Sequence, residues 1–153
     1  MEENYMRRAI ELAGKGEGHV NPNPLVGAVI VRDGEILAEG YHARYGDLHA
    51  ERSAFANLKT DATGAEMYVT LEPCPMCAGA IVQARIPEVV IGAMNPKAGC
   101  AGSIINLLQM DRLNHRVRME TGIMEEDCQK LLKDFFKDLR QKKKAEKKSS
   151  NES

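Results

Sequence analysis

The sequence predicts an α/β fold, a three-layer α/β/α sandwich around one mixed five-stranded sheet. Two observations lead to this prediction. Helical and strand patterns alternate along the second half of the chain, and two consecutive strand patterns occur in the first half. With 153 residues, 43% of them apolar and 28% charged, the chain has the composition of one globular domain whose core needs no disulfide staples.

The first half is expected to contain a helix, a buried hairpin and a second helix. The expected elements are a helix over about 4–14, strands over 25–31 and 35–41, and a helix from near 49 until 60–64. Gly14 and the glycines after it stop the first helix. The turn residues Asp33 and Gly34 join two strands, the first of which is an almost continuous apolar run. Asp47 can cap the second helix.

The second half is expected to alternate between strands and helices. The expected strands cover 67–71, 88–94 and 115–120, and the expected helices cover 75–85, 104–108 and 124–140. Pro75 suits the first turn of its helix. The last helix is amphipathic and includes the adjacent aromatic residues Phe135 and Phe136. One of such a pair is usually core, whereas an exposed one can stack on a base.

The charge is unevenly distributed although the net charge is only −1. Segment 137–148 contains seven Lys and Arg residues and two acidic ones. We expect residues 1–140 to form one domain and residues 141–153 to form a basic, disordered tail. The tail can be a solvated helix end that frays, or it can attract nucleic acid phosphates.

The compartment is expected to be the cytoplasm. The longest apolar stretch, 24–31, is far shorter than the roughly 18 residues that a membrane span needs, and the first residues have no signal-peptide pattern. In a reducing compartment, cysteines spaced as Cys74 and Cys77 are typical of a metal or redox site rather than of a disulfide.

Two short motifs, His49-Ala50-Glu51 and Pro73-Cys74-Pro75-Met76-Cys77, lie where a strand or loop passes into a helix. Helix N-termini favour thiolates, and one imidazole with two thiolates suits zinc. Three protein ligands leave the fourth tetrahedral position open for water, which indicates a catalytic site. A closed structural site would need a fourth ligand at matching spacing, and Cys100 and Cys128 do not form a second C-x-x-C.

Glu51 follows His49 by two residues and suits proton transfer better than ligation. A carboxylate beside the metal site can take a proton from water and return it to a leaving group. Hydrolytic removal of an amine from an aromatic base needs this chemistry, and the H-x-E and P-C-x-x-C motifs together are typical of zinc deaminases.

The chain resembles the cytidine deaminase superfamily, and within it the bacterial tRNA adenosine deaminases. The segments that carry the resemblance, besides the two motifs, are 26–31, 68–80, 101–103 and 114–117. The resemblance implies that His49, Cys74 and Cys77 bind one Zn²⁺ per chain and that Glu51 shuttles protons. It also implies a homodimer that converts adenosine to inosine at the wobble position of a tRNA anticodon loop.

Parts of the first half are more similar to the pyrimidine deaminase domain of riboflavin biosynthesis, notably segment 18–27 with its Asn-Pro-Asn-Pro and the run Gly40-Tyr41-His42. Asn23 and His42 are candidate substrate contacts. So is Asn95, which stands where the tRNA enzymes typically have Asp near a ribose hydroxyl. The alternative function is therefore deamination of a small pyrimidine or purine, meaning a riboflavin-pathway pyrimidine, a nucleoside or a free base.

The C-x-x-C spacing and the segment Asn114-His115-Arg116 favour the tRNA group over the small-substrate alternative. A second alternative is a zinc-stabilised binding subunit without catalysis. Glu51 argues against it, because a purely structural zinc site has no use for an acid–base group in that position.

Overall fold

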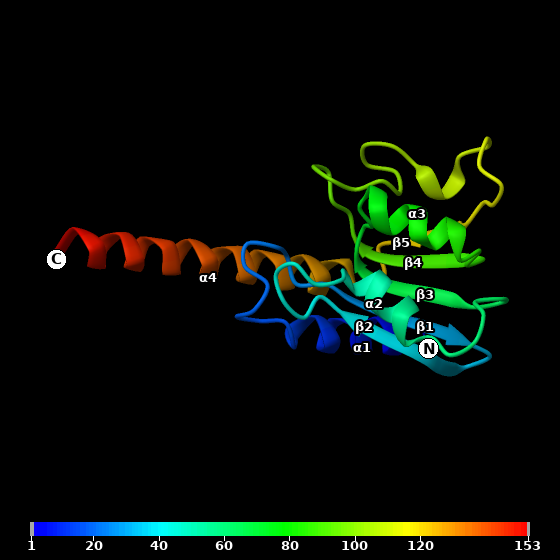
Figure 1. Cartoon of the computed structure of the whole chain (residues 1–153), viewed down its shortest axis with the longest axis horizontal. Helices are drawn as coiled ribbons and strands as arrows, with labels where there is room; N and C mark the ends of the chain where they lie inside the picture. The colour runs from blue at the N-terminus through cyan, green and yellow to red at the C-terminus, as the bar shows by residue number, and fades with distance from the viewer. Residues whose placement is uncertain (1, 153) are drawn as a thin grey trace.

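The computed structural model describes residues 2–152, with side chains for 2–148, and confirms the α/β class. One five-stranded sheet of order β2-β1-β3-β4-β5 lies between helices (Figure 1). Its elements in chain order are α1 (Glu2–Gly14), β1 (Gly27–Arg32), β2 (Glu35–Tyr41), α2 (Ala50–Asn57), β3 (Glu66–Leu71), α3 (Pro75–Gln83), β4 (Glu88–Ala93), the 3-10 turn η1 (Leu107–Gln109), β5 (Arg118–Thr121) and α4 (Glu125–Glu152).

The sheet is mixed, and its parallel half determines where a site can form. Strand β1 is antiparallel to both β2 and β3, whereas β3, β4 and β5 run parallel. Leu71 at the end of β3 pairs with Ala93 at the end of β4. The residues that follow these two strands therefore meet beyond the same edge of the sheet, where α/β proteins bind ligands.

Each face of the sheet has its own apolar core. Helices α2 and α3 pack on one face, where Ala54, Ile81 and the β4 residue Ile91 are fully buried. Helices α1 and α4 cover the other face, where Met6 and Cys128 join the core. The strands contribute apolar side chains to both cores, because successive side chains of a strand point to opposite faces of the sheet.

Two glycines allow helices to lie close to the first hairpin. A Cβ atom at Gly27 would overlap the backbone of Ala9 in α1, and one at Gly40 would overlap the backbone of Ala50 and Ala54 in α2. These contacts hold α1 and α2 against opposite faces of the sheet, so that the loop before α2 is held close to the end of β3.

Several expected elements differ from the structure, and helix α2 ends at Asn57, before the expected 60–64. In place of the predicted helix over 104–108, Ala101 forms a bridge with Asn106, and only the single 3-10 turn η1 over Leu107–Gln109 is helical. Gly102, at φ +131°, reverses the chain there, so the backbone pairs with itself instead of coiling. The predicted hairpin is buried only along β1. Strand β2 is an edge strand and is half exposed, because only one neighbour covers it.

Helix α4 extends well past the expected end at Arg140 and continues to Glu152, where a disordered tail was predicted. Lys, Gln, Ala and Glu dominate residues 141–148, and all have high helix propensity. The helix leaves the body of the molecule and projects from it (Figure 1). Ser153, the last residue of the predicted tail, lies outside the described residues.

Across residues 2–152, no helix combines the length and the apolar character that crossing a membrane requires.

Candidate active site

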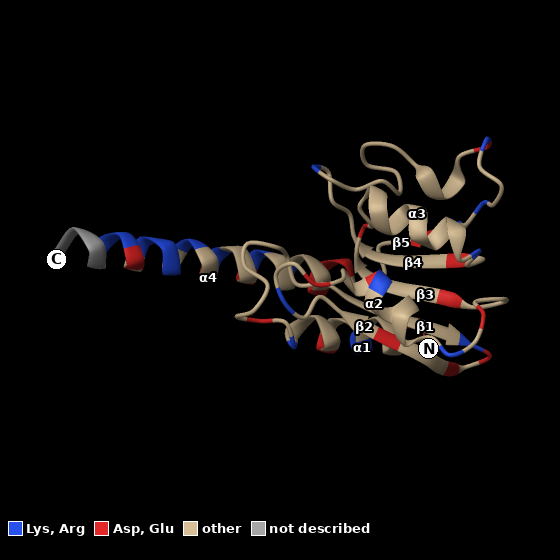
Figure 2. Ribbon diagram, in the orientation of Figure 1, with Lys and Arg blue, Asp and Glu red and all other residues tan. Residues whose placement is uncertain are grey.

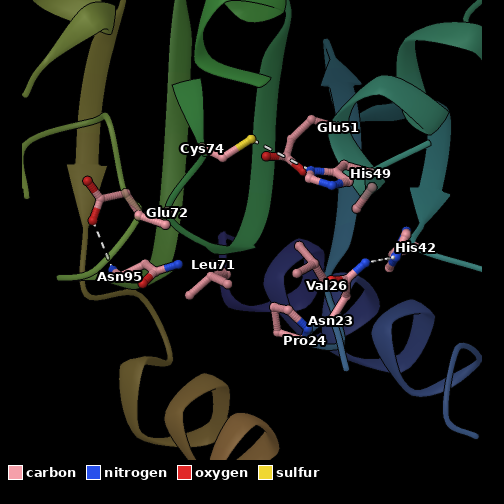
Figure 3. A pocket seen from close by; sticks show the side chains of 12 residues that line it. Asn23, Pro24, Val26, His42, His49, Glu51, Leu71, Glu72, Cys74 and Asn95 are labelled. Atoms are coloured by element: carbon pink, nitrogen blue, oxygen red, sulfur yellow. Dashed lines mark hydrogen bonds between the residues drawn. The ribbon is translucent and has the colours of Figure 1, made fainter. Parts of the chain in front are cut away.

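A cavity of about 160 Å³ opens beyond the carboxyl ends of β3 and β4 (Figure 3). Its wall brings together distant parts of the chain. The lining residues are Asn23, Pro24, Val26, His42, His49, Ala50, Glu51, Leu71, Glu72, Cys74, Asn95 and Ala98. Six of the seven residues predicted to form the site therefore line this cavity, and the seventh, Cys77, lies one helical turn beyond Cys74.

His49, Cys74 and Cys77 converge although they come from two different elements. His49 is the residue before α2, and Cys74 is the residue before α3. The Nδ1 atom of His49 lies 3.6 Å from Sγ of Cys74 and 3.5 Å from Sγ of Cys77. All three ligand atoms lie within 4.8 Å of one another.

These separations fit a zinc ion. Tetrahedral zinc with Zn–S bonds of about 2.3 Å and Zn–N bonds of about 2.0–2.1 Å places neighbouring N and S ligand atoms about 3.5 Å apart. The donor set of one imidazole and two thiols also matches the preference of zinc for nitrogen and sulfur ligands. His49, Cys74 and Cys77 can thus hold zinc with one position left for water or substrate.

The two thiols at this site differ in acidity. The hydrogen bond with Cys77 lowers the pKa of Cys74 to about 5, with His49 contributing in the same direction. The same hydrogen bond and burial raise the pKa of Cys77. Cys100 and Cys128 are buried in other places. Cys100 lies near the carbonyl oxygen of Ala98, and Cys128 packs with the core under α1.

Glu51 lies in the first turn of α2 and is 4% exposed. Burial raises the pKa of Glu51 to about 7. A carboxyl group with that pKa can both accept and release a proton near neutral pH. Figure 3 shows its side chain beside His49 and Cys74 at the cavity wall.

His42 and Asn23 form a connected pair in the opposite wall. Nδ1 of His42 lies 3.1 Å from the carbonyl oxygen of Leu48, which can only accept, so Nδ1 is the donor. In the neutral ring Nε2 then accepts from Nδ2 of Asn23 at 3.1 Å. The His42 ring also meets the His49 ring edge-on, with centroids 5.4 Å apart. The pair fixes the amide of Asn23 at the cavity.

Asn95 reaches the cavity from the loop after β4. Its backbone N–H donates to Oε1 of Glu72 at 2.9 Å (Figure 3). Its side-chain oxygen accepts from the backbone N–H of Lys97 at 3.3 Å. The carbonyl oxygen of Asn95 accepts from Gly99 at 2.8 Å. The loop thus folds on itself and presents Asn95 and Ala98 to the cavity.

Glu72 holds this loop in place, and reasoning from the sequence missed it. The buried carboxylate also accepts from the backbone N–H groups of Ala101 and Ser103, each at 2.9 Å. Burial opposes ionisation, but the hydrogen bonds, led by that from the Ser103 hydroxyl, keep the pKa of Glu72 below its ordinary value. The available signal was an acidic residue directly after an apolar strand and before Pro73-Cys74.

Comparison with known proteins agrees with this geometry. Residues 1–93 match the family model described as the cytidine and deoxycytidylate deaminase zinc-binding region. The tRNA-specific adenosine deaminase of Bacillus subtilis (strain 168) is 45% identical over 162 aligned positions, which cover 99% of this chain and 98% of that protein.

Two further comparisons show that the chain is similar both to a riboflavin biosynthesis protein and to a tRNA deaminase structure. The riboflavin biosynthesis protein RibD of Actinobacillus pleuropneumoniae is 45% identical over 139 positions, which cover 87% of this chain but only 36% of that protein. A solved structure from a study of A-to-I editing by tRNA:A34 deaminases at the wobble position has a TM-score of 0.74 and 30% identity, and the match covers 84% of this chain and 99% of that one. The chain belongs to the cytidine and deoxycytidylate deaminase family of zinc-binding enzymes.

Proposed function

We propose that this protein is a zinc-dependent hydrolytic deaminase that converts adenosine to inosine at the wobble position of tRNA. The observation that carries the proposal is the convergence of His49, Cys74 and Cys77 beside the buried carboxyl of Glu51 in one cavity. The chain that holds this site is 45% identical, over nearly its full length, to a tRNA-specific adenosine deaminase.

The proposed reaction adds water to C6 of adenine and releases the amino group as ammonia. His49, Cys74 and Cys77 would hold zinc, which when bound supplies a Lewis acid that activates water. Glu51 takes a proton from the attacking water and gives it to N1 of the ring. It then moves the second water proton, from the new C6 hydroxyl group, to the amino group, which leaves as ammonia. Because Glu51 is almost completely buried, bulk water does not compete for that proton.

We assign substrate contacts to Asn23, His42 and Asn95, whose side chains line the cavity. Asn23 is held by His42 and can offer its amide to the edge of a base. Asn95 lies on the other side, on the loop tied to Glu72. A cavity of about 160 Å³ suits a single base turned out of its strand, as an anticodon loop can present it.

The proposal includes a homodimer in the cytoplasm, the compartment of its tRNA substrate. Large apolar side chains are exposed on α3 and on the segment that follows β4, which supports a second copy of the chain as the partner. They are Met76, Ile104, Ile105, Met110 and Leu113. Sedimentation at micromolar concentration tests this point, and a monomer would contradict it.

The second candidate is deamination of a small pyrimidine or purine. The 45% identity to RibD favours it, together with the His42–Asn23 pair in the part of the chain that resembles riboflavin-pathway deaminases. This chain spans only 36% of that relative, so the whole activity of RibD does not transfer to it.

One experiment separates the two candidates. Zinc-loaded protein is incubated with a tRNA anticodon stem-loop bearing adenosine at the wobble position, and the product is sequenced for inosine. In parallel, ammonia release is measured from an aminopyrimidine nucleotide, adenosine and adenine. Conversion of the stem-loop supports the tRNA function. Ammonia release from a small substrate without any conversion of the stem-loop would replace it with the second candidate.

A further inference from the structure

Cys100 is a buried thiol beside the zinc site, and the proposed reaction does not use it. Its backbone N–H donates to the carbonyl oxygen of Pro73 at 2.8 Å, and the next residue after Pro73 is Cys74. Standard bond lengths then place the Cα atoms of Cys74 and Cys100 no more than about 7 Å apart. Two cysteines can form a disulfide without movement of the backbone when their Cα atoms lie within about 7 Å.

The backbone of Cys100 is held firmly in this place, whereas its thiol is held weakly. The carbonyl oxygen of Cys100 accepts from the backbone N–H of Leu107 at 2.9 Å, so both backbone polar groups of Cys100 are bonded. Sγ of Cys100 lies 3.8 Å from the carbonyl oxygen of Ala98, a residue of the cavity wall. Because a thiol is a weak hydrogen-bond donor, this contact offers little resistance to rotation about the Cα–Cβ bond.

Cys74, Cys77 and Cys100 differ in how an oxidant can reach them. Cys74 lines the cavity and is partly exposed, whereas Cys77 and Cys100 are buried (Figure 3). Cys74 and Cys77 belong to the ligand cluster, and Cys100 lies outside it. Of these three thiols, zinc therefore leaves that of Cys100 free. An oxidant that enters the cavity meets Cys74 first, and Cys100 is the free thiol beside it that can react next.

We propose that Cys74 and Cys100 form a reversible disulfide under oxidation, which removes a ligand from zinc and switches the enzyme off. The inference rests on the proposed function, because it takes His49, Cys74 and Cys77 as the zinc ligands of the active site. A catalytic zinc site has three protein ligands, so the loss of one releases the metal. In a reducing compartment such a disulfide persists only while an oxidant is present, as is typical of redox-sensing cysteines.

The oxidant that fits this site is a small, uncharged peroxide. The cavity of about 160 Å³ admits hydrogen peroxide but not a molecule as large as glutathione disulfide. Helix α3 and the turn η1 pack with Cys100 in one core and contain no Lys, Arg, Asp or Glu that would bind a charged oxidant (Figure 2).

The oxidation takes place in two steps. The Cys74 thiolate attacks one oxygen of hydrogen peroxide, the O–O bond breaks, and Cys74 becomes a sulfenic acid. The other oxygen leaves as hydroxide and takes a proton from the solvent. The Cys100 thiol then attacks the sulfur of Cys74, the S–O bond breaks, and the hydroxyl group leaves as water with the thiol proton. In total the two sulfur atoms lose two electrons, and one peroxide becomes two water molecules.

The test locates the disulfide in the zinc-loaded protein after treatment with hydrogen peroxide. Trypsin cuts after Lys and Arg, so Cys74 and Cys77 share the peptide 60–85, whereas Cys100 lies in the peptide 98–112. A disulfide between Cys74 and Cys100 joins the two peptides, whereas one between Cys74 and Cys77 stays within the first. Mass spectrometry should find the joined pair, with Cys74 identified by fragmentation. A zinc-responsive dye should report loss of the bound zinc over the same time.

Cys100→Ser removes the second thiol of the proposed disulfide. The matched control is Cys128→Ser, since Cys128 is a buried thiol in the core on the other face of the sheet. Without Cys100, Cys74 should oxidise further to sulfinic acid, which dithiothreitol does not reduce. After treatment with dithiothreitol and zinc, the wild type and Cys128→Ser should recover their zinc. Cys100→Ser should recover at least about threefold less zinc.

A disulfide confined to the peptide 60–85 in the wild type would overturn the proposal. So would zinc that stays bound in the oxidised wild type, or full recovery of zinc by Cys100→Ser. The proposed function fails in a different way. An untreated wild-type protein that binds zinc but deaminates neither the stem-loop nor a small substrate refutes the deaminase, whichever disulfide peroxide produces.

Discussion

Glu72 and Ser103 are joined by two hydrogen bonds, one from the backbone N–H of Ser103 and one from its hydroxyl group. The same carboxylate accepts from Asn95 and Ala101, so one buried side chain fixes both ends of the loop over 95–103. A Cβ atom at Gly99 would overlap the carboxylate of Glu72, which explains the glycine at that position. The residue two positions before Cys74 thus connects the metal site to the cavity wall.

Glu72→Gln should lower the free energy of unfolding by about 2 kcal/mol, because an amide nitrogen would replace an acceptor and leave buried N–H groups without a partner. Urea unfolding of the zinc-loaded protein and of the variant measures this difference in the free energy of unfolding. Ser103→Ala removes only the hydroxyl group that donates to Glu72 and leaves the backbone N–H bonds to that carboxylate in place, so it should cost about 1 kcal/mol. An equal cost for the two substitutions would show that Glu72 does not organise the loop.

Substitution of a proposed zinc ligand should lower both zinc content and stability. His49→Ala, Cys74→Ala and Cys77→Ala each remove one donor of the set, and metal binding is linked to folding. Metal analysis of the purified variants should find well below one zinc per chain. Cys100→Ser and Cys128→Ser are the controls and should retain full zinc. Loss of zinc in either control would show that the ligand set is wrong.

Glu51→Ala should keep one zinc per chain but lose activity by a factor on the order of 10³, within the range of general acid–base catalysis. The reason is that Glu51 is not among the three clustered ligands but lies buried next to them. Single-turnover rates on the stem-loop measure the effect. A variant with undiminished turnover would remove Glu51 from the mechanism. A wild-type protein with full zinc and no deaminase activity would support a non-catalytic binding subunit instead.

Sequence reasoning brought His49, Cys74 and Cys77 together, as the structure does, because short-range spacing places each of them at the start of a helix. His49 and Glu51 are two residues apart, Cys74 and Cys77 are three apart, and each pair begins a helix that an apolar strand or a loop precedes. Local pattern thus suffices to place these groups at helix N-termini. The parallel pairing of β3 and β4 then follows from the alternation of strands and helices.

The features that were not predicted from the sequence depend mainly on contacts between distant residues. The role of Glu72 needs the loop over 95–103 to fold around it. Its place between an apolar strand and Pro73-Cys74 marks Glu72 as unusual but does not identify this distant loop as its partner. The end of α4 was misjudged because Lys-rich composition indicates disorder, whereas the residues also have high helix propensity.

The division of the chain at residue 140 can be tested by truncation. A protein that ends after Arg140 should keep its zinc and its melting temperature, because residues 141–148 are exposed and contribute little to the core. It should bind the stem-loop more weakly and with a flatter salt dependence, since it lacks Lys143 and the lysines beyond it. A fall in melting temperature would show that the extension stabilises the domain. Unchanged binding would show that it serves only as a solubilising segment.

The ion pair between Arg8 and Glu39 should make stability depend on pH. Arg8 on α1 contacts the edge strand β2, with Nε and Nη2 lying 2.5 and 3.1 Å from the two carboxylate oxygens of Glu39. This hydrogen bonding keeps the pKa of Glu39 below its ordinary value of 4.5. A carboxyl group with a lowered pKa contributes stability above its ordinary pKa, and that contribution is lost as the pH falls through the lowered value.

Arg8→Gln should therefore lower the free energy of unfolding by about 1 kcal/mol at pH 7, the scale of a partly exposed bidentate pair. The difference from the wild type should shrink as the pH falls below 4.5, the ordinary pKa of Glu39. Arg7→Gln is the matched control, because Arg7 is the preceding residue and is exposed, so its substitution should have little effect at any pH. Urea titrations of the three proteins at several pH values measure these differences. A cost of Arg8→Gln that stays constant through acid pH would show that the side chain acts by packing on β2 and not by pairing with Glu39.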